Sequence, residues 1–244
     1  LWGLGEAVAS PLSDDVRARA MRLFEHAAEF RSRHLRSTAF AVLGAARVLA
    51  VSPSSFGAQA VVTDASRRWM DTVAAANGGG RRRRWPWPEE RLTYANAVVP
   101  EMLLVMGDAT GDRRMRAAGV DLLRWLVDVE TGRSGWLSVT PVGGWASGEP
   151  RPAFDQQPIE VASLADAAAT AARIDGSPAW REVVDRSARW FLGRNDVGAP
   201  MVDWATGGGF DGLTPTGPNL NEGAESTMAA ITTLQHARRM LHLV

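Results

Sequence analysis

Residues 195–227 read NDVGAPMVDWATGGGFDGLTPTGPNLNEGAEST. Glycine and proline recur here too often for a helix or a regular strand. A loop of this length inside a compact domain is usually functional or disordered, and Met201, Trp204, Phe210 and Leu213 argue for order. We therefore expect an ordered, acidic loop that forms part of a site for a polyhydroxylated ligand and leads into a final helix. The alternative is a purely structural Ω-loop.

Helical periodicity dominates the rest of the chain. Apolar residues recur at helical spacing, and turn or capping signals separate the segments. Residues 1–8 read like the inside of a helix, so we expect further helices upstream of Leu1. Pro100 falls within one expected helix and should kink or split it. The expected helices cover residues 14–30, 34–51, 56–76, 89–106, 113–129, 158–174, 178–192 and 222–243.

These helices predict an all-α fold. Short turns make consecutive helices antiparallel neighbours. The helices at 158–174 and 222–243 are rich in Ala and Thr nearly all round, which is typical of helices covered on both sides. Inner helices wrapped by amphipathic outer ones predict a toroid of antiparallel (α/α) hairpins, with residues 1–244 forming one domain as a partial (α/α)6 barrel. A helical-repeat solenoid is the alternative, although no repeat of fixed period is visible.

Two other segments lack a helical period. Glycines followed by Arg81 to Arg84 predict a solvated loop. Residues 131–152 contain Trp136, Trp145 and five glycines, which predict a long loop or a short hairpin.

Composition argues against several classes of function. Acidic and basic residues number 27 each, so no charge excess indicates a nucleic-acid partner. There is no lysine, which removes Schiff-base and P-loop chemistry, and no cysteine, which removes disulfides and thiol catalysis. No apolar run is long enough to span a membrane. We expect no metal, because metal-ligand spacing is absent among His26, His34, His236 and His242. We also expect no cofactor, and Gly3-x-Gly5 lacks the third glycine and the preceding strand of a dinucleotide-binding motif.

Carboxylates at loops and helix starts are the candidate reacting groups. Glu160 sits among apolar residues, where an unpaired charge is expensive and desolvation would favour the protonated form that a general acid needs. Asp155, Asp211 and Glu225 are candidates for the second carboxylate of glycoside hydrolysis, and spacing alone does not choose among them. The competing reading is capping for Asp155 and helix-dipole chemistry for Glu222 and Glu225.

Ten tryptophans suggest surfaces for sugar rings. A loop Trp beside Asp, Asn or Gln offers a flat apolar face together with hydrogen-bond partners. The alternative is that these rings only fill the end of the domain. The expected substrate-binding residues are Trp87, Glu89, Tyr94, Asn96, Trp136, Trp145, Gln156, Gln157, Trp204, Asn221 and Glu222.

Four short motifs carry a family resemblance. They are Trp85-x-Trp87-x-Glu89-x-x-Leu92-Thr-Tyr94-x-Asn96-Ala-x-x-Pro100-Glu101, Phe154-Asp-Gln-Gln-Pro-Ile-Glu160, Phe210-Asp-Gly-Leu and Asn221-Glu-Gly-Ala-Glu-Ser-Thr227. Their order resembles the bacterial helical-toroid domains that are fused to, or encoded beside, family 4 glycosyltransferases. Those domains belong to the six-hairpin (α/α)6 glycosidase-like superfamily. Pro88, Ala95 and Val98 depart from the family pattern.

The resemblance implies a cytoplasmic bacterial carbohydrate-active domain with a carbohydrate ligand and a glycosyltransferase partner. The leading expectation is a glycoside hydrolase-like enzyme with Glu160 as general acid, Asp155 or Asp211 as base and Glu225 in support. A non-catalytic glycan-binding or scaffold partner of a glycosyltransferase is the alternative. A sugar epimerase or isomerase of similar fold ranks third, because such enzymes rely on His and the motif loops contain none.

Overall fold

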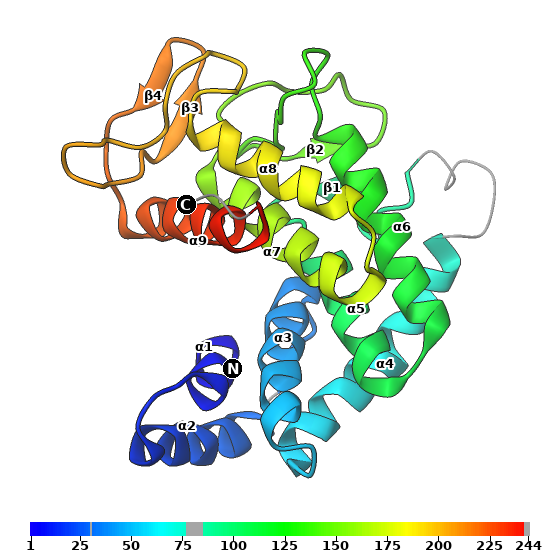
Figure 1. The fold of residues 1–244 in the computed structure, drawn as a ribbon. Coiled ribbons are helices and arrows are strands. Elements are labelled where there is room, and N and C mark those ends of the chain that lie inside the picture. The colour runs from blue at the N-terminus through cyan, green and yellow to red at the C-terminus, as the bar shows by residue number, and fades with distance from the viewer. Residues whose placement is uncertain (30, 77–84, 242–244) are drawn as a thin grey trace. The chain divides into compact units, whose positions relative to one another are not determined.

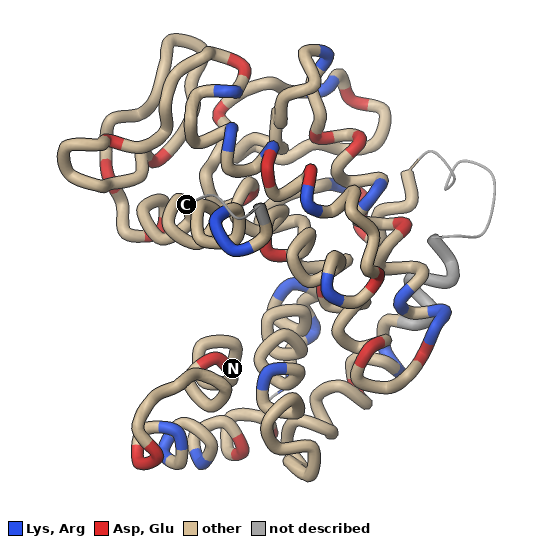
Figure 2. Tube along the Cα trace, in the orientation of Figure 1, with Lys and Arg blue, Asp and Glu red and all other residues tan. Residues whose placement is uncertain are grey.

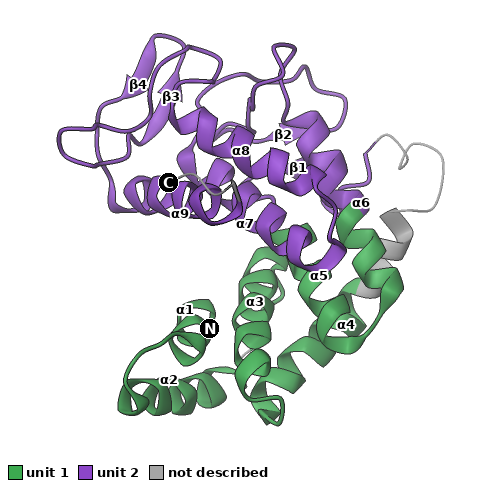
Figure 3. Cartoon of the chain, in the orientation of Figure 1, with its two compact units in different colours: residues 1–84, 98–120 green, residues 85–97, 121–244 purple. Residues whose placement is uncertain are grey.

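A computed structural model describes residues 1–29, 31–76 and 85–241, and these form nine helices and four very short strands (Figure 1). The expected all-α character is confirmed. The chain divides into two compact units, Leu1–Arg84 with Val98–Val120 and Trp85–Ala97 with Asp121–Val244 (Figure 3). The arginine-rich loop expected at Arg81 to Arg84 lies outside the described residues.

Unit 1 is arranged around α3. It contains α1 (Trp2–Ala9), α2 (Asp14–Ala27), α3 (Leu35–Val51), α4 (Phe56–Ala76), α5 (Val98–Thr110) and the first part of α6 (Arg113–Val129). Helix α3 packs against α1, α4 and α5, while α2 packs against α1 and α4. This central position explains the many buried residues of α3, which are Leu35, Ala39, Val42, Leu43, Gly44, Ala45 and Val48.

Helices α1 and α3 touch through their backbones. A Cβ atom added to Gly5 would lie 2.2 Å from the carbonyl oxygen of Gly44, and one added to Gly44 would lie 2.5 Å from the carbonyl oxygen of Leu1. Only glycine at both positions allows this approach. The helical reading of residues 1–8 is confirmed by α1.

Unit 2 contains the rest of α6, α7 (Pro158–Asp175), α8 (Ala179–Phe191) and α9 (Ala224–Leu241). The last three helices pack against one another in pairs (Figure 1). Pro158 opens α7, where a missing N–H does no harm, and Gly176 closes it with a left-handed φ of 74°. Helix α8 buries one face, made by Trp180, Val183, Val184, Ser187, Ala188, Trp190 and Phe191.

Two small antiparallel pairs stiffen the loops of unit 2. Strand β1 (Arg91–Leu92) pairs with β2 (Trp145–Ala146), and β3 (Gly212–Thr214) forms a hairpin with β4 (Gly217–Asn219). Isolated bridges join Pro141 to Gln156 and Gln156 to Leu213. Acidic positions recur along these loops (Figure 2), so the loop network is the part of unit 2 in which a polar site would form.

The helix expected at residues 89–106 is wrong in its first half. Helix α5 begins at Val98, and the preceding residues form β1 and a turn in which Ala95 has a φ of 44°. This conformation is incompatible with a right-handed helix. Pro100 therefore lies in the first turn of α5, where no intrahelical hydrogen bond is lost, and the expected kink has no cause.

The segment 131–152 combines both expected forms. Thr131 bridges to Leu137 around a tight turn at Gly135, which has a φ of 82°, so a minimal hairpin is present. The strand at Trp145, however, pairs with Leu92 rather than within its own segment. Sequence periodicity could not indicate this pairing because each strand is only two residues long.

The contact between α1 and α3 predicts that Gly5→Ala is destabilising, because the new methyl group would overlap backbone atoms that cannot rotate away. We expect the free energy of unfolding to fall by about 1–3 kcal/mol. Gly3→Ala on the same helix is the matched control, since its Cβ would meet nothing within 4 Å. It should raise the free energy of unfolding by up to about 1 kcal/mol through helix propensity. Urea denaturation would measure both values, and equal effects of the two variants would contradict this packing.

Candidate functional site

The loops of unit 2 meet at Gln156, which is completely buried. Its backbone exchanges two hydrogen bonds with Leu213, at 3.1 and 2.8 Å. Its side-chain oxygen accepts from the backbone N–H of Val139 and the indole N–H of Trp190, at 3.3 and 3.2 Å. Its amide nitrogen donates to Asp196 at 2.7 Å and to a nearby backbone carbonyl at 2.8 Å. All the hydrogen bonds that such an amide forms are thus made inside the protein, so Gln156 holds loops rather than a ligand.

Glu160 fixes the turn before α5. Its side chain is 4% exposed, and Oε1 accepts the backbone N–H of Ala95. Oε2 accepts the backbone N–H and the side-chain amide of Asn96, at 3.1 and 3.0 Å. The oxygen of that amide in turn accepts the N–H of Thr93 at 2.9 Å. Three N–H donors suit an ionised carboxylate, so Glu160 anchors the turn that carries Tyr94.

Tyr94 links this turn to the start of α9. The residue is 42% exposed, and its hydroxyl donates to Glu225 Oε2 at 3.3 Å. Partial burial, followed by the nearby carboxylates of Glu225 and Glu160, raises the pKa of Tyr94. The phenol therefore keeps its proton at neutral pH and remains a donor. Tyr94 and Glu225 form a polar pair that solvent can reach.

Asp211 fixes the chain that enters α9. Its carboxylate accepts the backbone N–H of Gly223 at 2.9 Å and the side-chain amide of Asn221. Hydrogen bonds from Asn221, Ser226 and Gly223 hold the pKa of Asp211 below its ordinary value, against a small opposing effect of burial. Asp211 is therefore ionised at neutral pH, and both it and Asn221 take part in loop structure.

Asp155 carries an unpaired carboxylate oxygen. Its Oδ1 is buried and has no hydrogen-bond partner in the described chain. This oxygen lies 2.9 Å from the position that a Cβ on Gly212 would occupy. A buried polar atom without a partner lowers stability, and such atoms are worth considering as functional groups.

These contacts place the candidate acids in one neighbourhood of unit 2. Asp155 touches Gly212, which follows Asp211. Asp211 accepts the backbone N–H of Gly223, which lies two residues before Glu225. Gly212 thus links Asp155 to Asp211, and the residues at the start of α9 link Asp211 to Glu225.

A second loop presents Trp204. The loop closes where the N–H of Asp203 donates to the carbonyl of Gly208 at 2.9 Å, and Trp204 is 69% exposed. Glu222 accepts the hydroxyl of Thr206 at 2.7 Å, which ties this loop to the segment before α9. Trp204 therefore offers an open indole face, while Glu222 supports the loop.

The remaining aromatic candidates lie in clusters. Trp87 is 4% exposed and stacks on Trp125 at 6.1 Å, so neighbouring side chains cover its ring. Trp85 packs edge-on against Trp125 at 5.2 Å and against Trp145 at 5.4 Å. Trp136 lies beneath the guanidinium of Arg194, at 5.2 Å from its carbon to the ring centre. Trp136 and Trp145 are partly exposed.

Two polar candidates act through their backbones. The carbonyl of Glu89 accepts the indole N–H of Trp85 at 3.1 Å. Gln157 is the N-cap of α7 without a side-chain capping bond, and its carbonyl accepts the N–H of Glu160 at 3.1 Å. These hydrogen bonds position the aromatic cluster and the first turn of α7.

Glu130 is a buried titratable group that the sequence analysis did not identify. It follows α6, is 2% exposed, and its Oε1 accepts the backbone N–H and the hydroxyl of Thr140 at 3.1 and 2.7 Å. Burial raises the pKa of Glu130 to about 7, although the Thr140 hydrogen bonds and the charge of Arg151 act in the opposite direction. Its only sequence signal is an acid that directly follows the apolar end of a helix.

Within the described ranges, no three His, Cys, Asp or Glu side chains gather as a metal site would require. The helices of those ranges also include none with the length and apolar character needed to cross a membrane.

Comparisons with known proteins add no assignment. The chain matches no profile of a known protein family and no curated protein.

The anchoring contacts of Glu160 predict that Glu160→Gln is destabilising. An amide supplies one acceptor oxygen and would point an N–H₂ group at a backbone N–H of the turn. We expect the free energy of unfolding to fall by about 1.5–3 kcal/mol, the scale of hydrogen bonds to charged groups. Glu182→Gln on the exposed face of α8 should change it by less than about 0.5 kcal/mol. Wild-type stability in Glu160→Gln would refute the anchoring role and favour the general-acid expectation.

The raised pKa of Glu130 predicts a specific pH dependence of the free energy of unfolding. Its folded pKa of about 7 exceeds the ordinary 4.5, so the folded state holds the proton more tightly. Stability should therefore fall as pH rises from about 4.5 to about 7 and then level off, by about 3 kcal/mol in total. Glu130→Gln lacks this titration and should exceed wild type in stability at about pH 8 while nearly matching it at about pH 4.5. Chemical denaturation at several pH values would measure the difference, and a pH-independent difference would contradict the assignment.

Proposed function

We propose that this chain is a carbohydrate-active domain of the (α/α) toroid type that hydrolyses glycosides with two carboxylates. The first support is the alternation of helix partners within each unit. Helix α1 packs on α3 and α3 on α5, and in unit 2 α7 packs on α9. Each of these pairs skips one helix in the chain, as the inner helices of stacked hairpins do. The amphipathic helices α2 and α8 pack beside them, as outer helices would.

The observation that carries the proposal is that the four sequence motifs contact one another. Tyr94 and Asn96 of the first motif bond to Glu225 of the fourth and Glu160 of the second. The other contacts are equally direct. Asp155 of the second motif touches Gly212 of the third, and Asp211 of the third bonds to Asn221 of the fourth. Motifs that are separate in sequence thus form one cluster of acids, amides and a phenol, as a sugar site would require.

Among the motif acids, we assign Asp155 and Glu225 as the reacting pair. Glu160 and Asp211 are bound by several N–H donors, and Glu222 is held by Thr206. Glu225 is exposed and accepts one hydrogen bond, from Tyr94, while Asp155 retains an oxygen without a partner. Hydrolysis of a glycosidic bond requires one carboxyl that exchanges a proton with the leaving oxygen and a second that activates water or attacks the sugar.

Trp204 supplies the proposed sugar platform. Its ring is exposed on a loop that Glu222 and Thr206 connect to the start of α9. An indole face stacked on a sugar ring replaces water over a large apolar area and leaves the hydroxyl groups to the neighbouring acids and amides.

A non-catalytic glycan-binding domain is the second candidate. The observation that favours it is that Glu160, Asp211 and Glu222 are already engaged in loop structure. Such a domain would use Trp204 and the remaining polar groups for affinity alone.

The proposal predicts turnover that depends on Glu225. Wild-type protein, incubated with a panel of end-labelled oligosaccharides, should release shorter labelled products, which chromatography would resolve. Glu225→Gln should lower the turnover of any cleaved glycan by at least about a hundredfold, the scale of acid–base catalysis. Glu182→Gln, which also removes an exposed acid from the first turn of a helix, should retain turnover within about twofold.

Three outcomes separate the candidates. Full turnover in Glu225→Gln would remove this residue from the mechanism. Binding without cleavage in wild type, weakened by Trp204→Ala, would establish the glycan-binding alternative. The absence of cleavage together with the absence of glycan-dependent retardation in affinity electrophoresis would contradict both candidates.

A further inference from the structure

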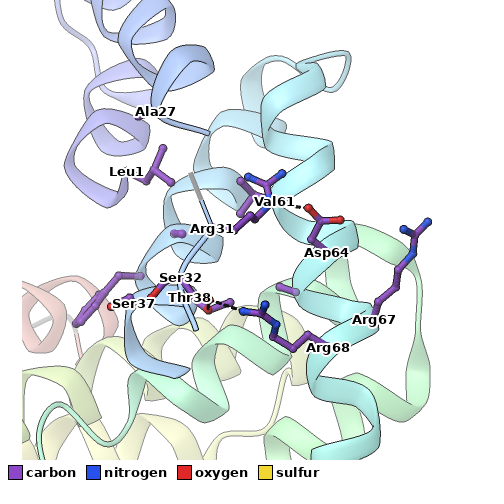
Figure 4. A pocket seen from close by; sticks show the side chains of 13 residues that line it. Leu1, Ala27, Arg31, Ser32, Ser37, Thr38, Val61, Asp64, Arg67 and Arg68 are labelled. Atoms are coloured by element: carbon purple, nitrogen blue, oxygen red, sulfur yellow. Dashed lines mark hydrogen bonds and ion pairs between the residues drawn. The ribbon is translucent and has the colours of Figure 1, made fainter. Parts of the chain in front are cut away.

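Unit 1 contains a cavity of about 770 Å³ that the proposed reaction does not use (Figure 4). It lies between residues of α3, residues of α4 and the segment that follows α2. Its volume falls within the range of about 300–1,000 Å³ that is typical of small-molecule sites. The cavity is open to solvent on the side of Arg31, Arg67 and Arg68, which are exposed, so a ligand could enter it.

The inner wall of the cavity is largely apolar. Phe40 and Ala41 contribute from α3, and Val61 and Ala65 contribute from α4. Val61 is 5% exposed and Ala65 is 3% exposed, so these side chains form a fixed surface. An occupant would therefore need an apolar part, and a small inorganic ion would leave this wall unused.

Charged residues at the cavity carry an excess of positive charge. Arg31 is neutralised by Asp64, with Nε and Oδ2 2.5 Å apart. Arg68 donates to the backbone carbonyl of Ser32. Because this carbonyl is neutral, the hydrogen bond does not neutralise the positive charge of Arg68. Among the described side chains, no carboxylate forms an ion pair with Arg68. A guanidinium has five N–H donors, so Arg68 keeps donors for a further acceptor.

Neighbouring Arg67 provides an internal comparison. It also lines the cavity, but its side chain points away from Arg31, Asp64 and Arg68 in Figure 4. The two arginines are adjacent in α4 and carry the same charge. They differ in whether the guanidinium faces the other polar groups of the cavity. Comparing variants of the two residues therefore distinguishes a direct contact with the ligand from a general electrostatic attraction.

We propose that this cavity binds an amphipathic organic anion, with its apolar chain against Phe40, Ala41 and Val61 and its carboxylate against Arg68. The planar guanidinium matches a carboxylate through two parallel hydrogen bonds. Arg68 is exposed, so the ion pair would form at the solvent-facing edge of the cavity while the apolar chain covers the wall. The site lies wholly in unit 1 and is independent of the glycoside proposal.

Isothermal titration calorimetry of the full chain with alkanoates below their micellar concentrations would test this site. Dodecanoate should bind saturably with one molecule per chain. Affinity should rise about threefold to fourfold for each methylene added between octanoate and dodecanoate, as burial of a methylene group predicts. Dodecanol should bind at least about tenfold more weakly than dodecanoate, because it lacks the charge that Arg68 recognises.

Matched variants locate the ligand. Arg68→Gln should weaken dodecanoate binding at least about tenfold and leave dodecanol binding unchanged, whereas Arg67→Gln should change dodecanoate affinity less than about twofold. Ala41→Leu should fill part of the cavity and reduce binding of both ligands. Circular dichroism would verify folding, and Ala27→Leu at another lining position serves the same purpose if Ala41→Leu unfolds.

Several results would overturn the proposal. They are the absence of saturable dodecanoate binding, equal affinity for dodecanoate and dodecanol, and equal losses in Arg67→Gln and Arg68→Gln. Unchanged affinity in a folded cavity-filling variant would likewise place the ligand elsewhere.

Discussion

The hydrogen bonds between Glu160 and the turn at Ala95 and Asn96 are the constraint on which the candidate site depends. A carboxylate buried to this extent would be strongly destabilising without donors, and the N–H groups of Ala95 and Asn96, which are themselves buried, would lack partners without the carboxylate. Each therefore stabilises the other. The consequence extends to both sides of the turn. Tyr94 is brought to Glu225, and the backbone is kept out of the helical conformation until Val98.

Much of the helical framework could be predicted from local sequence, because its signals are local. Pro158 and the glycine at position 176 mark the ends of α7 within one residue of the expected bounds. The start of α5 could not be predicted in this way, since the donors that Glu160 binds are mostly backbone N–H groups, which any sequence possesses. Burial of Glu160 itself was predictable from its apolar neighbours. Two prolines flank Trp87 and indicate a loop residue, but the ring of Trp125, which is distant in sequence, stacks on it and covers it.

The glycines of residues 195–227 have a second role beside that of turn formation. A Cβ on Gly223 would lie 2.4 Å from a carboxylate oxygen of Asp211, and one on Gly208 would lie 1.9 Å from an oxygen of Glu222. Neither glycine requires a left-handed backbone. Their small size lets acidic side chains approach the backbone, and at Gly223 the carboxylate of Asp211 also accepts the backbone N–H. The same composition that indicates a loop thus also permits a loop dense in carboxylates, which the sequence pattern alone does not distinguish.

Glu130 and Glu160 illustrate why residue type and burial do not determine the role of an acid. Both are almost completely buried, at 2% and 4% exposure. Thr140 donates two hydrogen bonds to a single oxygen of Glu130, and burial still raises the pKa of that carboxyl to about 7. Glu160 receives donors on both oxygens and holds a turn in place. The difference lies in the number and placement of donors supplied by segments distant in sequence. Donors on both oxygens make Glu160 a structural anchor, whereas the donors on one oxygen of Glu130 do not offset the effect of its burial on the pKa.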